Sequence, residues 1–182
     1  ATTYKVGDFD QNGATDLVAL VDGGSAVRFL FSRVDSSDGL PGVHRFEEGL
    51  LVLPPDAGPY EALEAGDFDA DGRPDLFLGS AVRDALVLYL AAERSCEVGS
   101  VCIEEAIPLA VRAEGPVAVG NFDGALGDDL LLVSYARGST LARALWSEAG
   151  RAFSPAGRAK RAAKGMAVPY PGNFDGGRAD DV

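Results

Sequence analysis

The chain has 182 residues, of which 28 are acidic and 16 are basic, so its formal net charge is −12. A surface with this excess of negative charge repels phosphate groups, which argues against nucleic acids and anionic membranes as main partners. No apolar run approaches the length of a membrane-spanning helix, so membrane insertion is not expected.

The sequence is organised around an acidic motif that occurs four times. The copies begin at Gly7, Gly66, Gly120 and Gly172, so they recur every 52 to 59 residues. Such a period is typical of a repeat protein, in which each unit packs on its neighbours. We therefore expect a single array over residues 1–182, with repeats at 1–58, 59–112, 113–165 and 166–182, the last of them truncated.

The first repeat has four short segments rich in the β-branched and aromatic residues that are typical of strands. Turn-forming residues separate these segments, at 22–24 and in the loop SRVDSSDGLPG at 32–42. The expected strands are 1–6, 17–21, 27–31 and 43–49. The first repeat is therefore predicted to be a four-stranded meander.

The second and third repeats follow the same order, and Phe153 is expected to fill the core of the third unit. The Ala-rich and basic segment 156–167 is the best candidate for a short helix. The sequence thus predicts an all-β protein of three complete four-stranded antiparallel units and part of a fourth. The further expected strands are 60–66, 76–80, 85–91, 103–111, 116–120, 130–135, 141–148 and 150–155.

The second motif copy, GDFDADGRPDLFLG, has the ligand spacing of a calcium loop. Its aspartates stand at positions 1, 3, 5 and 9, a glycine at position 6 permits a sharp turn, and position 7 offers a main-chain carbonyl. Carboxylates at alternate positions of a curled loop form an all-oxygen cage, which suits Ca²⁺ better than zinc or copper. The predicted ligands are Asp67, Asp69, Asp71, Asp75 and the carbonyl of Arg73.

The first copy, GDFDQNGATDLVAL, satisfies the same template, with Gly13 at position 6. The opening of both loops is shared with the EF-hand, but position 12 of the second copy is Leu78 instead of glutamate, and strand patterns flank the loop. A helix-loop-helix site is therefore rejected. The predicted ligands in the first copy are Asp8, Asp10, Asn12, Asp16 and the carbonyl of Ala14.

The third and fourth copies depart from the template, because Ala125 and Gly177 at position 5 offer no side-chain oxygen. These two loops are expected to bind a cation more weakly or to use water as a ligand. The alternative for any copy is a hairpin turn whose carboxylates stay solvated and bind nothing. The candidate ligands in these copies are Asn121, Asp123, Asp129, Asn173, Asp175 and Asp181.

The segments GDFDQNGATDLV, GDFDADGRPDLF and GNFDG-x-x-x-DD resemble the FG-GAP or VCBS repeats of integrin α-chain type β-propellers, bacterial secreted proteins and fungal lectins. The resemblance implies four-stranded blades whose calcium loops join two strands, and hence a partial β-propeller. It also implies a non-catalytic adhesion or interaction module of a secreted or cell-surface protein, contacting protein or glycan. Since three blades and part of a fourth cannot close a usual propeller, we expect either further blades in a longer parent protein or association of copies.

Two other functions stay open at this point. The chain can be the accessory, substrate- or glycan-binding part of an exported hydrolase or lyase, or a self-assembling extracellular structural protein. Cys96 and Cys102 have a spacing that allows a local disulfide, which fits an exported protein, although two reduced cysteines are the alternative.

The remaining features favour binding over catalysis. His44 is the only histidine and lies near no nucleophile motif, so we do not expect an enzyme. Trp146 is expected in the core between units, although aromatic residues of this kind also stack on sugars, as Tyr135 and Tyr170 would. A basic run is expected to be a solvated face or a contact for an acidic partner, and it comprises Arg151, Arg158, Lys160, Arg161 and Lys164.

Overall fold

The computed structural model of the chain describes residues 3–35, 43–54, 58–91, 102–136, 139–148, 151–155 and 160–161. None of the helices in this part of the chain is long and apolar enough to cross a membrane. Several residues singled out above lie outside the described ranges: Cys96, Arg158, Lys164, Tyr170, Asn173, Asp175, Gly177 and Asp181.

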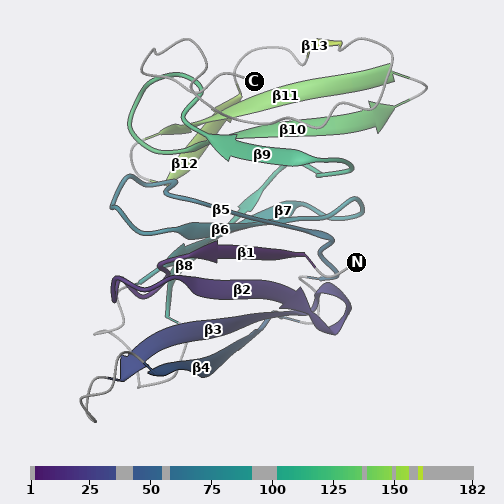
Figure 1. The fold of residues 1–182 in the computed structure, drawn as a ribbon. Coiled ribbons are helices and arrows are strands. Elements are labelled where there is room, and N and C mark those ends of the chain that lie inside the picture. The colour runs from purple at the N-terminus through teal and green to yellow at the C-terminus, as the bar shows by residue number, and fades with distance from the viewer. Residues whose placement is uncertain are drawn as a thin grey trace.

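The described chain folds into three antiparallel sheets, each built from strands that follow one another in sequence (Figure 1). The first sheet contains β1 (Tyr4–Gly7), β2 (Asp16–Val21), β3 (Ala26–Asp35) and β4 (Val43–Val52) in that order. A single 3-10 turn at Asp22–Gly24 joins β2 to β3, where the sequence predicted a turn. The four-stranded meander expected for the first repeat is confirmed.

The second and third sheets repeat this arrangement. The second contains β5 (Ala62–Gly66), β6 (Asp75–Gly79), β7 (Ala85–Leu90) and β8 (Ile103–Leu109). The third contains β9 (Val117–Gly120), β10 (Asp129–Ala136), β11 (Ser139–Glu148) and β12 (Ala152–Pro155). The expected all-β class of four-stranded antiparallel units is therefore confirmed.

The third sheet has one additional strand, β13 (Lys160–Arg161), which pairs with β11. The short helix expected over 156–167 is wrong at these two residues. Helix propensity is a weak preference, and pairing with the edge of a sheet overrides it because the sheet supplies the backbone hydrogen bonds. The other residues of that segment lie outside the described chain.

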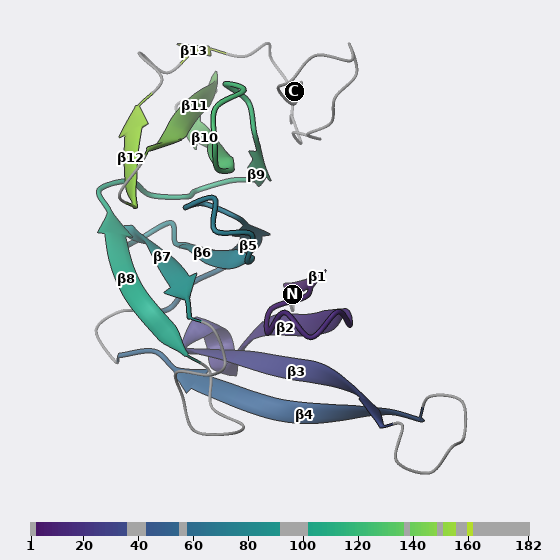
Figure 2. The same ribbon diagram turned by 90° about the vertical axis from the view of Figure 1, so that its left-hand side faces the viewer.

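The three sheets stack face to face in chain order, with β1, β5 and β9 next to one another on one side (Figure 2). Across the described residues the sheets do not close into a ring, as expected of blades from a partial propeller. The loops that carry the acidic motif lie between the first two strands of each sheet. The stack therefore sets three equivalent loops beside one another.

Two apolar clusters fill the spaces between the sheets. In the first, Val18 and Phe29 of the first sheet pack with Leu76 and Leu78 of β6. In the second, Phe77, the residue between those two leucines, packs toward the third sheet with Leu130 and its neighbours. Because successive side chains of a strand point to opposite faces, β6 is buried on both sides, which explains its uninterrupted apolar sequence.

The phenylalanine at position 2 of the motif anchors the first two loops in these clusters. Phe9 is 3% exposed and contacts Phe29, whereas Phe68 is 1% exposed and contacts Phe153 of β12. Phe153, which the sequence predicted in the core of the third unit, is half-buried and packs against the second cluster. Trp146, also expected between blades, is half-buried and belongs to neither cluster of the described residues.

Candidate metal centres

The acidic loops are hairpin loops with a fixed relation to the strands. In each of the first three repeats the leading glycine of the motif pairs with the aspartate at position 9 across the hairpin. These register pairs are Gly7 with Asp16, Gly66 with Asp75, and Gly120 with Asp129. The loop residues between them are thus held at both ends by paired strands.

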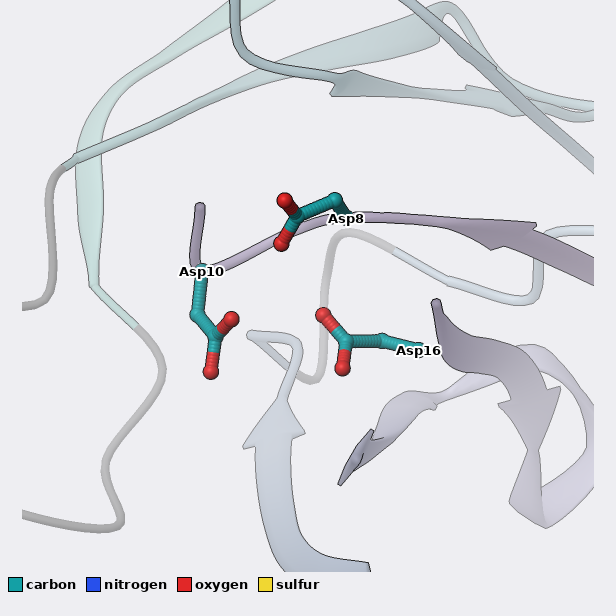
Figure 3. Close-up of side chains that lie close together, drawn as sticks. All are labelled: Asp8, Asp10 and Asp16. Atoms are coloured by element: carbon teal, nitrogen blue, oxygen red, sulfur yellow. The ribbon is translucent and has the colours of Figure 1, made fainter. Parts of the chain in front are cut away.

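The first loop brings three predicted ligands together. One carboxylate oxygen from each of Asp8, Asp10 and Asp16 lies within 4.8 Å of the others, and the three side chains converge on one space (Figure 3). Asn12, at position 5, donates from its side-chain amide to the carbonyl of Ser32 at 2.7 Å and accepts from the backbone N–H of Ala14 at 2.6 Å. The first loop is therefore a compact group of oxygen donors.

The second loop also forms a group of three, from Asp67, Asp69 and Asp71 at positions 1, 3 and 5, whose oxygens lie within 4.8 Å of one another, whereas the first group uses positions 1, 3 and 9. Asp75 is not a member of this group. Both groups offer carboxylate oxygens without nitrogen or sulfur, which is the donor chemistry that Ca²⁺ prefers. The residues present therefore fit a calcium ion.

The curvature of both loops comes from hydrogen bonds to the aspartate at position 1. Asp67 accepts from the backbone N–H groups of Asp71 and Gly72 at 3.0 and 2.9 Å, and Asp8 has the same two partners in its own loop. Gly72 has a φ of 84°, in the left-handed region that favours glycine. The turn expected from a glycine at position 6 is confirmed.

A comparison with protein-family models matches residues 8–78, which span the first two loops and the sheet between them, to the family described as FG-GAP-like repeat. Both loops therefore belong to a segment that is similar to an FG-GAP-like repeat. Comparisons with curated proteins and with solved structures gave no significant match. The match agrees with the resemblance inferred from the motif.

The aspartate at position 9 of each described acidic loop has a role that the sequence analysis did not assign. Asp75 accepts from the backbone N–H of Phe68 at 3.2 Å and from that of Leu90 in β7 at 3.0 Å. It thereby joins its own loop to the third strand of its sheet. We call this arrangement the aspartate bracket.

The aspartate bracket recurs in all three sheets. Asp16 accepts from Phe9 at 2.9 Å and from Ser32 at 2.7 Å, and Asp129 accepts from Phe122 and Ser147 at 2.8 Å each. The three bracket aspartates, Asp16, Asp75 and Asp129, are at most 1% exposed. A signal for this role exists in the sequence, because position 9 directly precedes each of the expected strands at 17–21, 76–80 and 130–135.

Burial also changes the protonation of the bracket aspartates. Burial raises the pKa of Asp75 to about 7, although its two backbone hydrogen bonds oppose the shift. Burial likewise raises the pKa of Asp16 and of Asp129 above the ordinary value. A nearby cation would favour the charged form of these carboxylates and so oppose the effect of burial.

The third loop is built differently, as its departures from the template predicted. Among the described residues, groups of three acids close enough to share an ion occur in the first two loops and not in the third. Asn121 accepts from the backbone N–H of Gly124 at 2.7 Å, and Asp123 accepts from Ala125 at 2.8 Å. Metal binding by Asn121, Asp123 and Asp129 stays a prediction, as do the carbonyl ligands at Ala14 and Arg73.

The third loop instead contacts the second. The carboxylate of Asp128 accepts from the backbone N–H of Asp67 at 2.9 Å, and the N–H of Asp128 donates to the carbonyl of Asp67 at 2.8 Å. Between the first and second loops, Gln11 donates to the carbonyl of Gly72 at 3.3 Å. Neighbouring loops are therefore connected by direct hydrogen bonds.

Arginines contact the same carboxylates that are the candidate ligands. Arg33 of β3 forms an ion pair with Asp10 in the first loop and another with Glu47 at 2.9 Å. In the second loop, Arg151 pairs with Asp69 at 2.9 Å, and Arg73 pairs with Asp71. In both loops, therefore, a guanidinium offsets part of the negative charge at position 3.

Proposed function

We propose that the chain is a calcium-stabilised, non-catalytic interaction module of β-propeller type. One observation carries the proposal: a group of three converging carboxylates occurs in each of the first two acidic loops, and both loops lie in the segment that matches the FG-GAP-like repeat. FG-GAP repeat domains are generally non-catalytic. A bound Ca²⁺ would offset the negative charge of these carboxylates, which the neighbouring arginines offset only in part. Asp8, Asp10, Asn12 and Asp16 would hold one ion, and Asp67, Asp69, Asp71 and Asp75 the other.

Calcium is expected to raise the thermal unfolding midpoint. An ion that binds only the folded chain stabilises it by about 2.7 kcal/mol per site at a concentration of 100 Kd. For a chain of this size, that corresponds to a rise of roughly 5–10 °C per site. Calorimetry in excess Ca²⁺ and then in chelator measures this shift.

A double variant with Asp8→Asn and Asp67→Asn should lose the calcium-dependent rise, since it removes one charge from each group. Asp84→Asn, at an exposed aspartate in the turn between β6 and β7, is the matched control and should keep the rise. An equal midpoint of the unchanged chain in Ca²⁺ and in chelator would contradict the proposal.

Export to the cell surface or the medium is part of this proposal. Cys102 is disulfide-bonded, and the chain has one other cysteine, Cys96. Disulfides persist in oxidising compartments and are rare in the cytosol. Extracellular calcium is also concentrated enough to fill sites of modest affinity.

A second candidate function, self-association, is favoured by the outer face of the first sheet. Of the seven large apolar residues that are exposed in the described chain, five lie on this sheet. The strand register places them all on the face turned away from the second sheet. They are Tyr4, Val6, Phe46, Leu50 and Val52.

The face of the second sheet that corresponds to the exposed face of the first sheet is buried. Leu63 and Leu78 stand where the first sheet has Tyr4 and Ala19, and both leucines are fully buried against the first sheet. The surface that would cover the exposed face of the first sheet is therefore another sheet of the same repeat type. We propose that a second copy of the chain supplies it.

Light scattering over a range of concentrations tests self-association. We expect the mass to rise above the 18.9 kDa of one chain, and Val6→Glu to abolish the rise because it places a charge on the proposed contact. Val82→Glu is the control, since Val82 is 60% exposed, like Val6 at 61%, but lies in a turn of the second sheet. A single-chain mass at every concentration would overturn the proposal.

A further inference from the structure

Arg151 joins the third sheet to the calcium loop of the second. It directly precedes β12, yet its Nε lies 2.9 Å from Oδ2 of Asp69, which is 82 residues away in the sequence. Its Nη2 lies 2.7 Å from Oε2 of Glu104, and its Nη1 lies 3.5 Å from Oε2 of Glu105. All three guanidinium nitrogens therefore contact carboxylates of the second sheet.

The surroundings hold the guanidinium in place. Cζ of Arg151 lies 4.9 Å from the centroid of the Tyr89 ring, which is itself fully buried. The side chain of Arg151 is 20% exposed and that of Asp69 is 11% exposed, so water screens their attraction only in part. Charge-assisted hydrogen bonds in such a setting are stronger than those at an open surface.

Calcium and Arg151 would bind the same carboxylate, that of Asp69. Asp69 is one of the three acids that converge in the second loop, and one of its oxygens is already the partner of Nε of Arg151. A Ca²⁺ ion that binds this oxygen must displace Nε of Arg151, so the loss of the ion pair offsets part of the free energy of calcium binding. The free energy of the Arg151–Asp69 contact is therefore subtracted from the free energy of calcium binding.

We propose that Arg151 sets the calcium affinity of the second loop, by acting as an internal cation that the ion has to displace. The inference rests on the proposed calcium binding. It further implies that calcium loosens a contact between the second and third sheets, so occupancy of the loop is coupled to the packing of the neighbouring blade. Arg151 is a positioning residue in this scheme and not a ligand.

Isothermal titration with Ca²⁺ tests the proposal, in an Asp10→Asn background that weakens the first loop so that the second is observed. Arg151→Met keeps an apolar stem over the Tyr89 ring and removes the charge. We expect it to tighten calcium binding about tenfold, because a charge-assisted contact no longer competes. In chelator, the same variant should unfold at a lower temperature than its parent.

Arg83→Met is the control, because Arg83 is exposed in the turn between β6 and β7, outside the acidic loops and outside the face proposed for self-association. It should leave the calcium affinity unchanged. An affinity of Arg151→Met within twofold of its parent, or weaker, would overturn the inference while leaving calcium binding intact. If only Arg151→Met binds calcium, the inference is supported and the proposed function of the unchanged chain is wrong. If neither protein binds calcium, both are wrong.

Discussion

Asp75→Ala is expected to lower the free energy of unfolding by about 4 kcal/mol, since it leaves two buried backbone N–H groups without an acceptor. The partners that lose their acceptor are Phe68 in the loop and Leu90 in β7. Phe68 is anchored in the core between the second and third sheets, so the loss also frees a core side chain. For a chain of this length the unfolding midpoint should fall by roughly 8–16 °C.

The measurement is calorimetry in chelator, so that a lost metal ligand does not contribute to the difference. Asp84→Ala is the control, because Asp84 is exposed and surface substitutions of this kind change stability by about 0.5 kcal/mol or less. If Asp75→Ala and Asp84→Ala unfold at the same temperature in chelator, the aspartate bracket does not stabilise the fold.

Gly24→Ala is the second substitution with a large expected effect, a loss of about 3 kcal/mol or more. Gly24 has a φ of 90°, and a Cβ atom there would lie 2.0 Å from the carbonyl oxygen of Tyr60. The carbonyl of Gly24 also accepts the backbone N–H of Tyr60 at 3.0 Å, so the two segments cannot separate without losing this bond. The close approach joins the first repeat to the segment that leads into β5.

Gly23→Ala separates this clash from backbone strain alone. Gly23 also has a positive φ, of 67°, but a Cβ atom there would have no neighbour within 4 Å. Its substitution should cost only about 1 kcal/mol, the strain of a left-handed alanine. Equal losses for Gly23→Ala and Gly24→Ala in urea unfolding would show that the contact with Tyr60 is not the cause.

The aspartates of the acidic loops have two roles that can be separated. The aspartate at position 1 shapes the loop, whereas the one at position 9 is buried and joins strands. In the first loop Asp16, at position 9, joins strands and also converges with Asp8 and Asp10. The third repeat demonstrates the separation, because it keeps the bracket at Asp129 while its loop lacks the acidic group among the described residues. A repeat whose loop has no group of three acids can therefore still keep the hydrogen bonds of the aspartate bracket.

Most of the fold could be predicted from the sequence because its signals are local. Each strand of the first three repeats is marked by apolar and β-branched residues, and the turns between strands by glycine and aspartate. The repeat period then assigns strands to units. The segment at 156–167 was mispredicted where Lys160 and Arg161 pair with β11, since that pairing depends on an edge formed elsewhere in the chain.

The candidate site was predictable only in part, for a similar reason. The convergence of Asp8, Asp10 and Asp16 follows from spacing within one short loop. The contacts of Arg151 with Asp69 and of Asp128 with Asp67 join different repeats, so no pattern within a short segment predicts them. Which acids face a shared space and which are engaged by another sheet depends on how the sheets stack.

The repeated four-stranded units, each with an acidic loop, follow from the sequence alone, because strand pattern and loop spacing are properties of short segments. The partners of those acids, in contrast, depend on how the sheets pack. Packing of the sheets buries Asp75 and the equivalent Asp16 and Asp129 beneath the loops, and it places Arg151 of the third sheet against Asp69. Burial and long-range ion pairing arise only when one sheet packs on another.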